Sequence, residues 1–189
     1  LTDLGALLHL VDPTLPIGGF NHSNGLETFV QQRVVESKAT LEEYVQTQLL
    51  QNWIYNDGAY LSLAFDAMCE GNFDRLCELD WQLSATKVAR ESREGSFKLG
   101  VRLLKIFIRY ETHTLLTAYQ QAIAEKRVQG YFPIVFAMVA QAMGLSKADT
   151  LYAFYYNAAV GAITNGVKLI PLSQMAGQDI LFDLRGSLV

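Results

Sequence analysis

The distribution of proline is the feature that most limits how this chain can fold. The 189 residues contain only four prolines, which are Pro13, Pro16, Pro133 and Pro171. Because proline removes a backbone N–H donor and breaks the interior of a helix, the long stretches between these positions can form uninterrupted helices. In those stretches apolar residues recur at the three- and four-residue spacing of one helical face. The sequence therefore predicts an all-α fold.

Residues that begin and end helices stand beside the apolar runs. Thr40 with Glu43 forms a capping-box pattern, and Ser146 with Asp149 repeats it. Asn72 is placed to cap a further helix through its side-chain oxygen. Glycines suited to helix C-termini follow two other apolar runs, at Gly71 and Gly144.

These signals predict a single-domain, compact bundle of about ten helices over residues 1–189. Short connections favour antiparallel neighbours. The helices are expected at 4–10, 23–32, 41–53, 59–69, 73–85, 88–110, 113–125, 133–143, 147–170 and 174–184. The helix at 147–170 is apolar almost all round and is expected in the middle of the bundle. Its small residues suit tight packing, with a helix-lined ligand pocket as the alternative.

Composition narrows the class of protein. The formal charge of −4 and the pI of about 5.3 argue against non-specific binding to nucleic acid, which requires a basic face.

No apolar run reaches the roughly 18 residues of a membrane span, and the first residues do not resemble a secretory leader. We therefore expect a cytoplasmic protein. Two cysteines, Cys69 and Cys77, do not form a disulfide framework and are expected to be reduced thiols.

The first segment that could carry function is a stiff corner at residues 12–20, Asp-Pro-Thr-Leu-Pro-Ile-Gly-Gly-Phe. Pro16 restricts the backbone, and Gly18 and Gly19 permit positive φ angles. Phe20 and Ile17 are expected to dock into the core. A phosphate-binding loop is the alternative, but the segment lacks Gly-Lys-Ser/Thr and a preceding strand.

His22 and Glu27 follow this corner and resemble an acid–base pair. Positions five apart on a helix share a face poorly, so a small helical hydrolase or lyase using them is a minor alternative. We expect the corner to present both side chains to a partner protein instead. Histidine and cysteine spacings typical of metal sites do not occur, so no metal site and no cofactor are predicted.

Two later segments hold further candidates. Glu91, Arg93 and Ser96 stand on a helix that also contains two glycines, which suggests close approach of a helix or a partner chain. The alternative for these side chains is a solvated charged face. Lys168 and Gln174 flank a proline break near the end of the chain, where Lys168 also suits a helix C-terminus.

Together these segments resemble the UreF family of urease accessory proteins. Residues 12–20 and the following Asn-His-Ser-Asn-Gly-Leu-Glu at 21–27 match the opening pattern of the family. The mid-chain pattern Glu-x-Arg-x-x-Ser-x-x-x-Gly spans residues 91–100, and Val-Lys-Leu-Ile-Pro-Leu-Ser-Gln at 167–174 matches a late pattern. Lys168 stands where the family usually has arginine. The positive charge is kept, but lysine cannot donate the two parallel hydrogen bonds of a guanidinium group. Ser173 stands where the family usually has glycine. The C-terminal tail of the family is absent from this sequence.

The resemblance implies an all-α fold, often dimeric, and a complex with UreD (also called UreH) and the GTPase UreG. That complex delivers nickel to apo-urease. In this reading the chain is a non-catalytic adaptor and regulator that binds nickel at most weakly. A regulator resembling a GTPase-activating protein is the alternative, with Lys168 or Arg93 reaching the phosphates of UreG.

Overall fold

The computed structural model describes residues 2–18 and 25–188, and this part of the chain is helical, without a strand. The all-α prediction is confirmed. The α-helices are α1 (Thr2–Leu10), α2 (Leu26–Gln31), α3 (Lys38–Gln48), α4 (Ala59–Cys69), α5 (Phe73–Thr86), α6 (Arg90–Phe107), α7 (Thr114–Ala124), α8 (Phe132–Ala142), α9 (Lys147–Leu169) and α10 (Gln174–Leu184). A π-helix, Leu49–Gly58, joins α3 to α4, and a 3-10 turn, Arg185–Ser187, follows α10.

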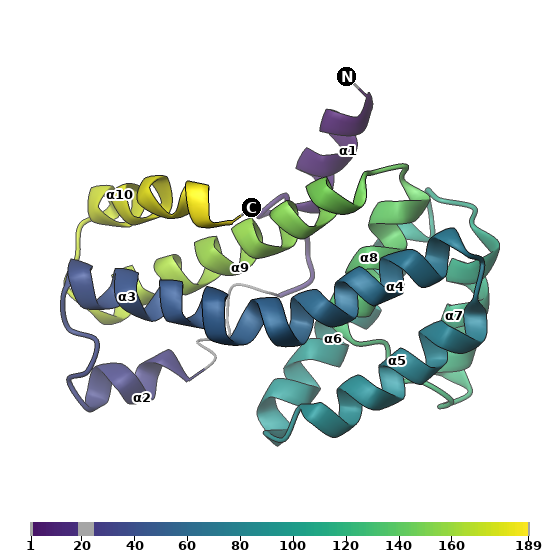
Figure 1. Ribbon diagram of the computed structural model, residues 1–189, viewed down its shortest axis with the longest axis horizontal. Coiled ribbons are helices and arrows are strands. Elements are labelled where there is room, and N and C mark those ends of the chain that lie inside the picture. The colour runs from purple at the N-terminus through teal and green to yellow at the C-terminus, as the bar shows by residue number, and fades with distance from the viewer. Residues whose placement is uncertain (1, 19–24, 189) are drawn as a thin grey trace.

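The helices form two packed groups that share one long rod (Figure 1). The rod consists of α3, the π-helix and α4. At one end of it α9 packs against α10, α3 and α2, and at the other end α8 packs against α4 and α6 while α5 lies along α4. The rod therefore ties the two groups together.

The centre of the core is α8 rather than α9. Each residue from Pro133 to Ala140 is buried, and α8 contains no charged side chain. The expectation that 147–170 lies in the middle of the bundle needs correction, because α9 is buried along one side and half-exposed along much of the rest. Its charged ends at Lys147, Asp149 and Lys168 favour such a boundary position.

Most of the capping predictions are confirmed. The Asn72 side chain accepts from the Arg75 N–H (3.0 Å), and the Ser146 hydroxyl accepts from the Asp149 N–H (3.1 Å). Gly71 and Gly144 adopt positive φ angles (68° and 79°) just after α4 and α8. Glycine takes this conformation without the Cβ strain that other residues meet.

The box predicted at Thr40 and Glu43 is wrong in register. Ser37 is the N-cap of α3, its hydroxyl accepts from the Thr40 N–H (3.3 Å), and the Thr40 hydroxyl accepts from the Ser37 N–H (3.0 Å). The helix therefore begins at Lys38, three residues before the predicted start. A threonine at the third position can return the hydrogen bond that Glu43 was expected to supply.

The predicted break between 53 and 59 is absent. The chain stays helical from Lys38 to Cys69 and changes to π geometry over Leu49–Gly58. Side chains at Gln48, Asn52 and Asn56 form a ladder, with amide donors bonding at 2.9 and 2.8 Å. Gly58 does not end the helix, since it keeps helical backbone angles (φ −67°, ψ −38°). The Tyr155 hydroxyl packs against it and leaves no room for a Cβ. Wide π turns are often associated with functional sites.

Two further helices are shorter than predicted. α2 begins at Leu26, behind Gly25 with its φ of 92°, instead of at residue 23, and residues 23 and 24 lie outside the described residues. α6 extends over Arg90–Phe107 instead of 88–110. In the part of the chain that the structure describes, no helix combines the length and apolar character needed to cross a membrane.

Candidate functional site

The opening corner is held by contacts on both sides. The Asp12 carboxylate accepts from the Thr14 N–H (2.7 Å) and hydroxyl (2.6 Å), and these hydrogen bonds lower the pKa of Asp12. Ile17 is buried, as predicted. The guanidinium of Arg102, on α6, donates to the Ile17 carbonyl (2.9 Å). The corner is thus tied to a helix that lies far along the sequence.

Gly18 adopts the positive φ angle that glycine was expected to permit in this corner, at 82°. A Cβ at this position would come within 2.7 Å of Arg102 Nη1, so a side chain would disturb that anchor. Pro16 is exposed in the same corner. Gly19, Phe20 and His22 lie outside the described residues, so their predicted roles stay predictions.

Glu27 lies in the first turn of α2 and is exposed. Its neighbour Leu26 is fully buried and anchors the short helix. An acidic residue suits the first turn of a helix, because the orphan N–H groups there carry partial positive charge. Glu27 is therefore presented at the surface, and its predicted role in partner binding remains a prediction.

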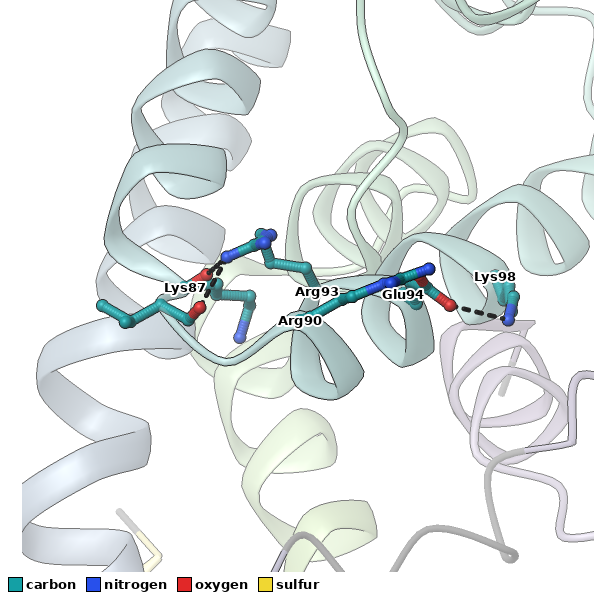
Figure 2. Close-up of polar contacts among 6 residues, drawn as sticks. Lys87, Arg90, Arg93, Glu94 and Lys98 are labelled. Atoms are coloured by element: carbon teal, nitrogen blue, oxygen red, sulfur yellow. Dashed lines mark hydrogen bonds and ion pairs between the residues drawn. The ribbon is translucent and has the colours of Figure 1, made fainter.

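Arg93 links the end of α5 to the beginning of α6 (Figure 2). One guanidinium nitrogen, Nη1, donates to the backbone carbonyls of Lys87 (2.7 Å) and Val88 (2.6 Å). These carbonyls lie just past the last turn of α5, where acceptors lack helical partners. Lys87 itself forms a half-buried ion pair with Asp57 of the π-helix (2.6 Å). The Lys87–Val88 connection is therefore fixed from two directions.

Ser96 and Gly100 contact the segment that leads into α8. The Ser96 hydroxyl accepts from the Phe132 N–H (3.3 Å). Gly100 packs directly against the Gly130 carbonyl, so that any Cβ would collide with backbone. The glycine therefore permits the close approach that was predicted, and the approaching chain is this protein's own α7–α8 connection. Glu91, by contrast, is exposed in the first turn of α6.

Asp80 holds the same connection from the opposite side and was missed by sequence reasoning. It is fully buried in α5. Its carboxylate accepts from the Tyr119 hydroxyl (2.7 Å), and from the N–H groups of Gln129 (2.6 Å), Gly130 (2.9 Å) and Tyr131 (3.2 Å). A signal existed, because Asp80 stands four residues after Leu76 and three before Leu83, on the apolar face.

Lys168 and Gln174 flank the break between α9 and α10, and both are exposed. Lys168 lies in the last turn of α9, as predicted, where a cation is favourable. Ser173 caps α10, because its hydroxyl accepts from the Ala176 N–H (3.1 Å). The serine that departs from the resembled pattern is therefore a helix cap.

The structure divides the candidates into two places. Glu27 belongs to the end of the molecule where α2 and α10 pack on α9, together with Lys168 and Gln174. Arg93 and Ser96 belong to α6, which packs on α8. Among the described residues, no three histidine, cysteine or carboxylate side chains gather closely enough to hold a metal ion.

Comparison with known proteins shows the family to which this chain belongs. The UreF family model matches residues 35–185. Urease accessory protein UreF of Haemophilus influenzae (strain ATCC 51907 / DSM 11121 / KW20 / Rd) is 99% identical over 189 residues, which are 100% of this chain and 80% of that protein. The chain belongs to the UreF family of urease accessory proteins.

More distant UreF proteins align over nearly the same length. UreF of Actinobacillus pleuropneumoniae serotype 5b (strain L20) is 81% identical over 182 residues, covering 96% of this chain and 80% of that protein. UreF of Bacillus sp. (strain TB-90) is 32% identical over 180 residues, covering 95% and 79%. The resemblance drawn from three short patterns is therefore confirmed over the whole chain. The UreF family model begins at residue 35, so the opening corner lies outside that match.

Proposed function

We propose that this UreF-family chain is a non-catalytic adaptor and regulator in the maturation of urease. In this role it bridges UreD (UreH) and the GTPase UreG and so supports the delivery of nickel to apo-urease. Membership of the family over the whole chain is the observation that carries the proposal.

The arrangement of the candidates is consistent with binding rather than chemistry. Arg93 and Ser96 are engaged in contacts within the fold, while Glu27, Glu91, Lys168 and Gln174 are exposed. Catalytic groups would instead converge on one cleft. The hydrolase alternative depends on His22, which lies outside the described residues, and nothing in the described part favours it.

Co-purification tests this adaptor role directly. A tagged full-length chain co-expressed with UreD and UreG should retain both proteins, and it should restore urease activity in a strain that lacks its own UreF. Purified alone, it should not hydrolyse GTP. Failure to retain either protein, with urease activation intact, would contradict bridging.

Regulation of GTP hydrolysis is the second candidate function, and Lys168 favours it. This cation is exposed at the end of α9 and forms no ion pair with the described residues, whereas Arg93 is occupied by two carbonyls. If Lys168 reaches the phosphates of UreG, Lys168→Ala should abolish any stimulation of GTP hydrolysis. Lys126→Ala, at another exposed lysine, is the matched control. Equal stimulation by both variants would remove Lys168 from this role.

Homodimerisation, cytoplasmic location and weak nickel binding complete the proposal. Sedimentation at several concentrations tests the dimer, and fractionation of cells tests the location. Calorimetry with nickel chloride should give at most weak binding to the isolated chain. A tight, stoichiometric site would contradict this part of the proposal.

A further inference from the structure

One face of α6 and its C-terminal extension has a charge opposite to that of the molecule. Lys98, Arg102, Lys105 and Arg109 follow one another at intervals of four, three and four residues, which places them on one helical face. All four are exposed. We call these four residues the basic stripe, and at 1.5 Å per residue it is about 16 Å long.

The charge of the stripe is not neutralised within its own segment. Residues 95–110 contain these four bases and no acid. Because the whole chain carries a formal charge of −4 and this segment +4, the remainder of the chain carries −8. At the beginning of the stripe Lys98 shares Glu94 with Arg90, at 3.4 and 2.7 Å (Figure 2). No ion pair within the described residues involves Arg102, Lys105 or Arg109.

Packing holds the stripe in place. The opposite face of α6 is formed by Leu103, Leu104 and Phe107, which are buried against the core. Arg102 is fixed at the surface by its hydrogen bond to the Ile17 carbonyl. The helix backbone and Arg102 are therefore ordered before a partner binds, which lowers the entropy cost of binding for that part of the stripe.

We infer that the basic stripe is a docking surface for an acidic helix of a partner protein. This inference deepens the adaptor role and rests on it. Carboxylates repeating every three to four residues along a helix match the spacing of the stripe. Complementary charge of this kind gives orientation and rapid association.

Two other classes of anionic partner fit the observations less well. Four cations on a chain whose remainder carries −8 are few for a nucleic acid, because a long polyanion would also meet that negative surface. A membrane surface needs apolar anchors beside the bases. From residue 98 to residue 109 no large apolar side chain is exposed, since Leu99, Val101, Ile106 and Ile108 are at least half-buried. The next residue, Tyr110, is 62% exposed, and its ring lies against the Arg109 guanidinium (5.8 Å to the ring centroid), so the vesicle measurement below is needed to test this class of partner.

The test uses the full-length protein and a labelled helical peptide that carries glutamates at the spacing of the stripe. Fluorescence anisotropy at 50 and 300 mM NaCl should show binding that weakens as salt screens the charges. Lys105→Glu/Arg109→Glu should lower the affinity by about tenfold or more. Arg33→Glu/Lys126→Glu is the matched control, because both residues are exposed and form no ion pair within the described part of the chain. It changes the net charge equally and should stay within about twofold of the unmodified protein.

Several results would overturn the inference. Equal losses in the two double variants would show that net charge, not the stripe, governs binding. Tighter binding of a single-stranded oligonucleotide, or of vesicles containing phosphatidylserine, would assign the stripe to another partner class. Co-purification separates this inference from the adaptor role. If the unmodified chain retains UreD and UreG and Lys105→Glu/Arg109→Glu retains them equally, the stripe fails while the adaptor role stands.

Discussion

Replacement of Asp80 tests most directly how this fold is held together. The carboxylate lies fully buried between α5 and the α7–α8 connection and accepts four hydrogen bonds. Asp80→Ala removes the acceptor and leaves the Tyr119 hydroxyl and three backbone N–H groups without a partner. Because the N–H groups belong to consecutive residues 129–131, these three residues lose their backbone hydrogen bonds to α5, whereas the contact of Ser96 with the Phe132 N–H remains.

The expected loss follows from these contacts. A buried donor that loses its acceptor costs about 1–3 kcal/mol. A groove lined by Trp81, Ser84 and Gln129 lies beside Asp80. Once the carboxylate is removed, water can enter from this groove and bond some of the donors, so the low end of that range applies. Four donors then give a loss of about 4 kcal/mol for Asp80→Ala, a large part of the 5–15 kcal/mol typical of a domain.

Asp80→Asn should cost less. Its carbonyl oxygen can take the place of Oδ2, which accepts from Tyr119, Gly130 and Tyr131. Its NH2 group then faces the N–H of Gln129, and one hydrogen bond is replaced by a repulsive contact. The expected loss is about 2 kcal/mol.

Urea unfolding followed by circular dichroism measures these losses. Asp66→Asn is the control, since Asp66 is exposed and pairs with Lys147 at 2.7 Å. It should cost less than about 1 kcal/mol. A loss below that level for Asp80→Ala, at an unchanged m-value, would refute the reasoning. Equal losses for Asp80→Ala and Asp80→Asn would show that charge, rather than the number of unpaired donors, dominates.

Three further predictions follow from single contacts. Gly100→Ala should destabilise by about 2 kcal/mol or more, because its Cβ meets the Gly130 carbonyl. Gly161→Ala should stabilise by about 0.5–1 kcal/mol, because no atom beyond its own helical turn lies within 4 Å of the new Cβ. Thermal unfolding measures both variants, and a change in stability of the same sign for the two would contradict the packing argument. Arg93→Ala should cost about 1–2 kcal/mol and Arg93→Lys less, as measured by urea unfolding, because the two carbonyls after α5 lose their donor. Burial and the Asp80 charge raise the pKa of Tyr119 well above its ordinary value of 10.0. Folding favours the neutral form of Tyr119. The contribution of Tyr119 to the free energy of unfolding is therefore complete below pH 10 and is lost as the pH rises through the raised pKa. Tyr119→Phe should therefore weaken the alkaline decline of stability, and an unchanged decline would refute the assignment.

Much of the helical framework could be predicted from local sequence. Asn72 and Ser146 cap helices through their own side chains, and Gly71 and Gly144 end them with positive φ angles. These interactions join residues within a few positions of each other, so the order of the chain is enough to reveal them. The error at Thr40 was local as well, because Ser37 competes for the same cap.

The candidate site was less predictable because its contacts are long-range. Arg93 and Ser96 were expected to face a partner, and the structure shows that they also bond the protein's own α5 end and α8 start. Their role in binding stays a prediction. The contact that holds the opening corner could not be predicted for the same reason, since Ile17 and Arg102 are 85 residues apart along the chain.

Local patterns along residues 12–174 were sufficient to predict the all-α class, most of the caps and the family. The position of α8, rather than α9, at the centre of the core became visible only in the packed helices. The continuation of the chain through a π-helix into α4, and the anchoring by Asp80 of a connection about 50 residues away, became visible in the same way. The physical reason is the range of the interactions. Helix formation and capping depend on neighbours within one turn, whereas burial and the pairing of buried polar groups depend on which helices meet.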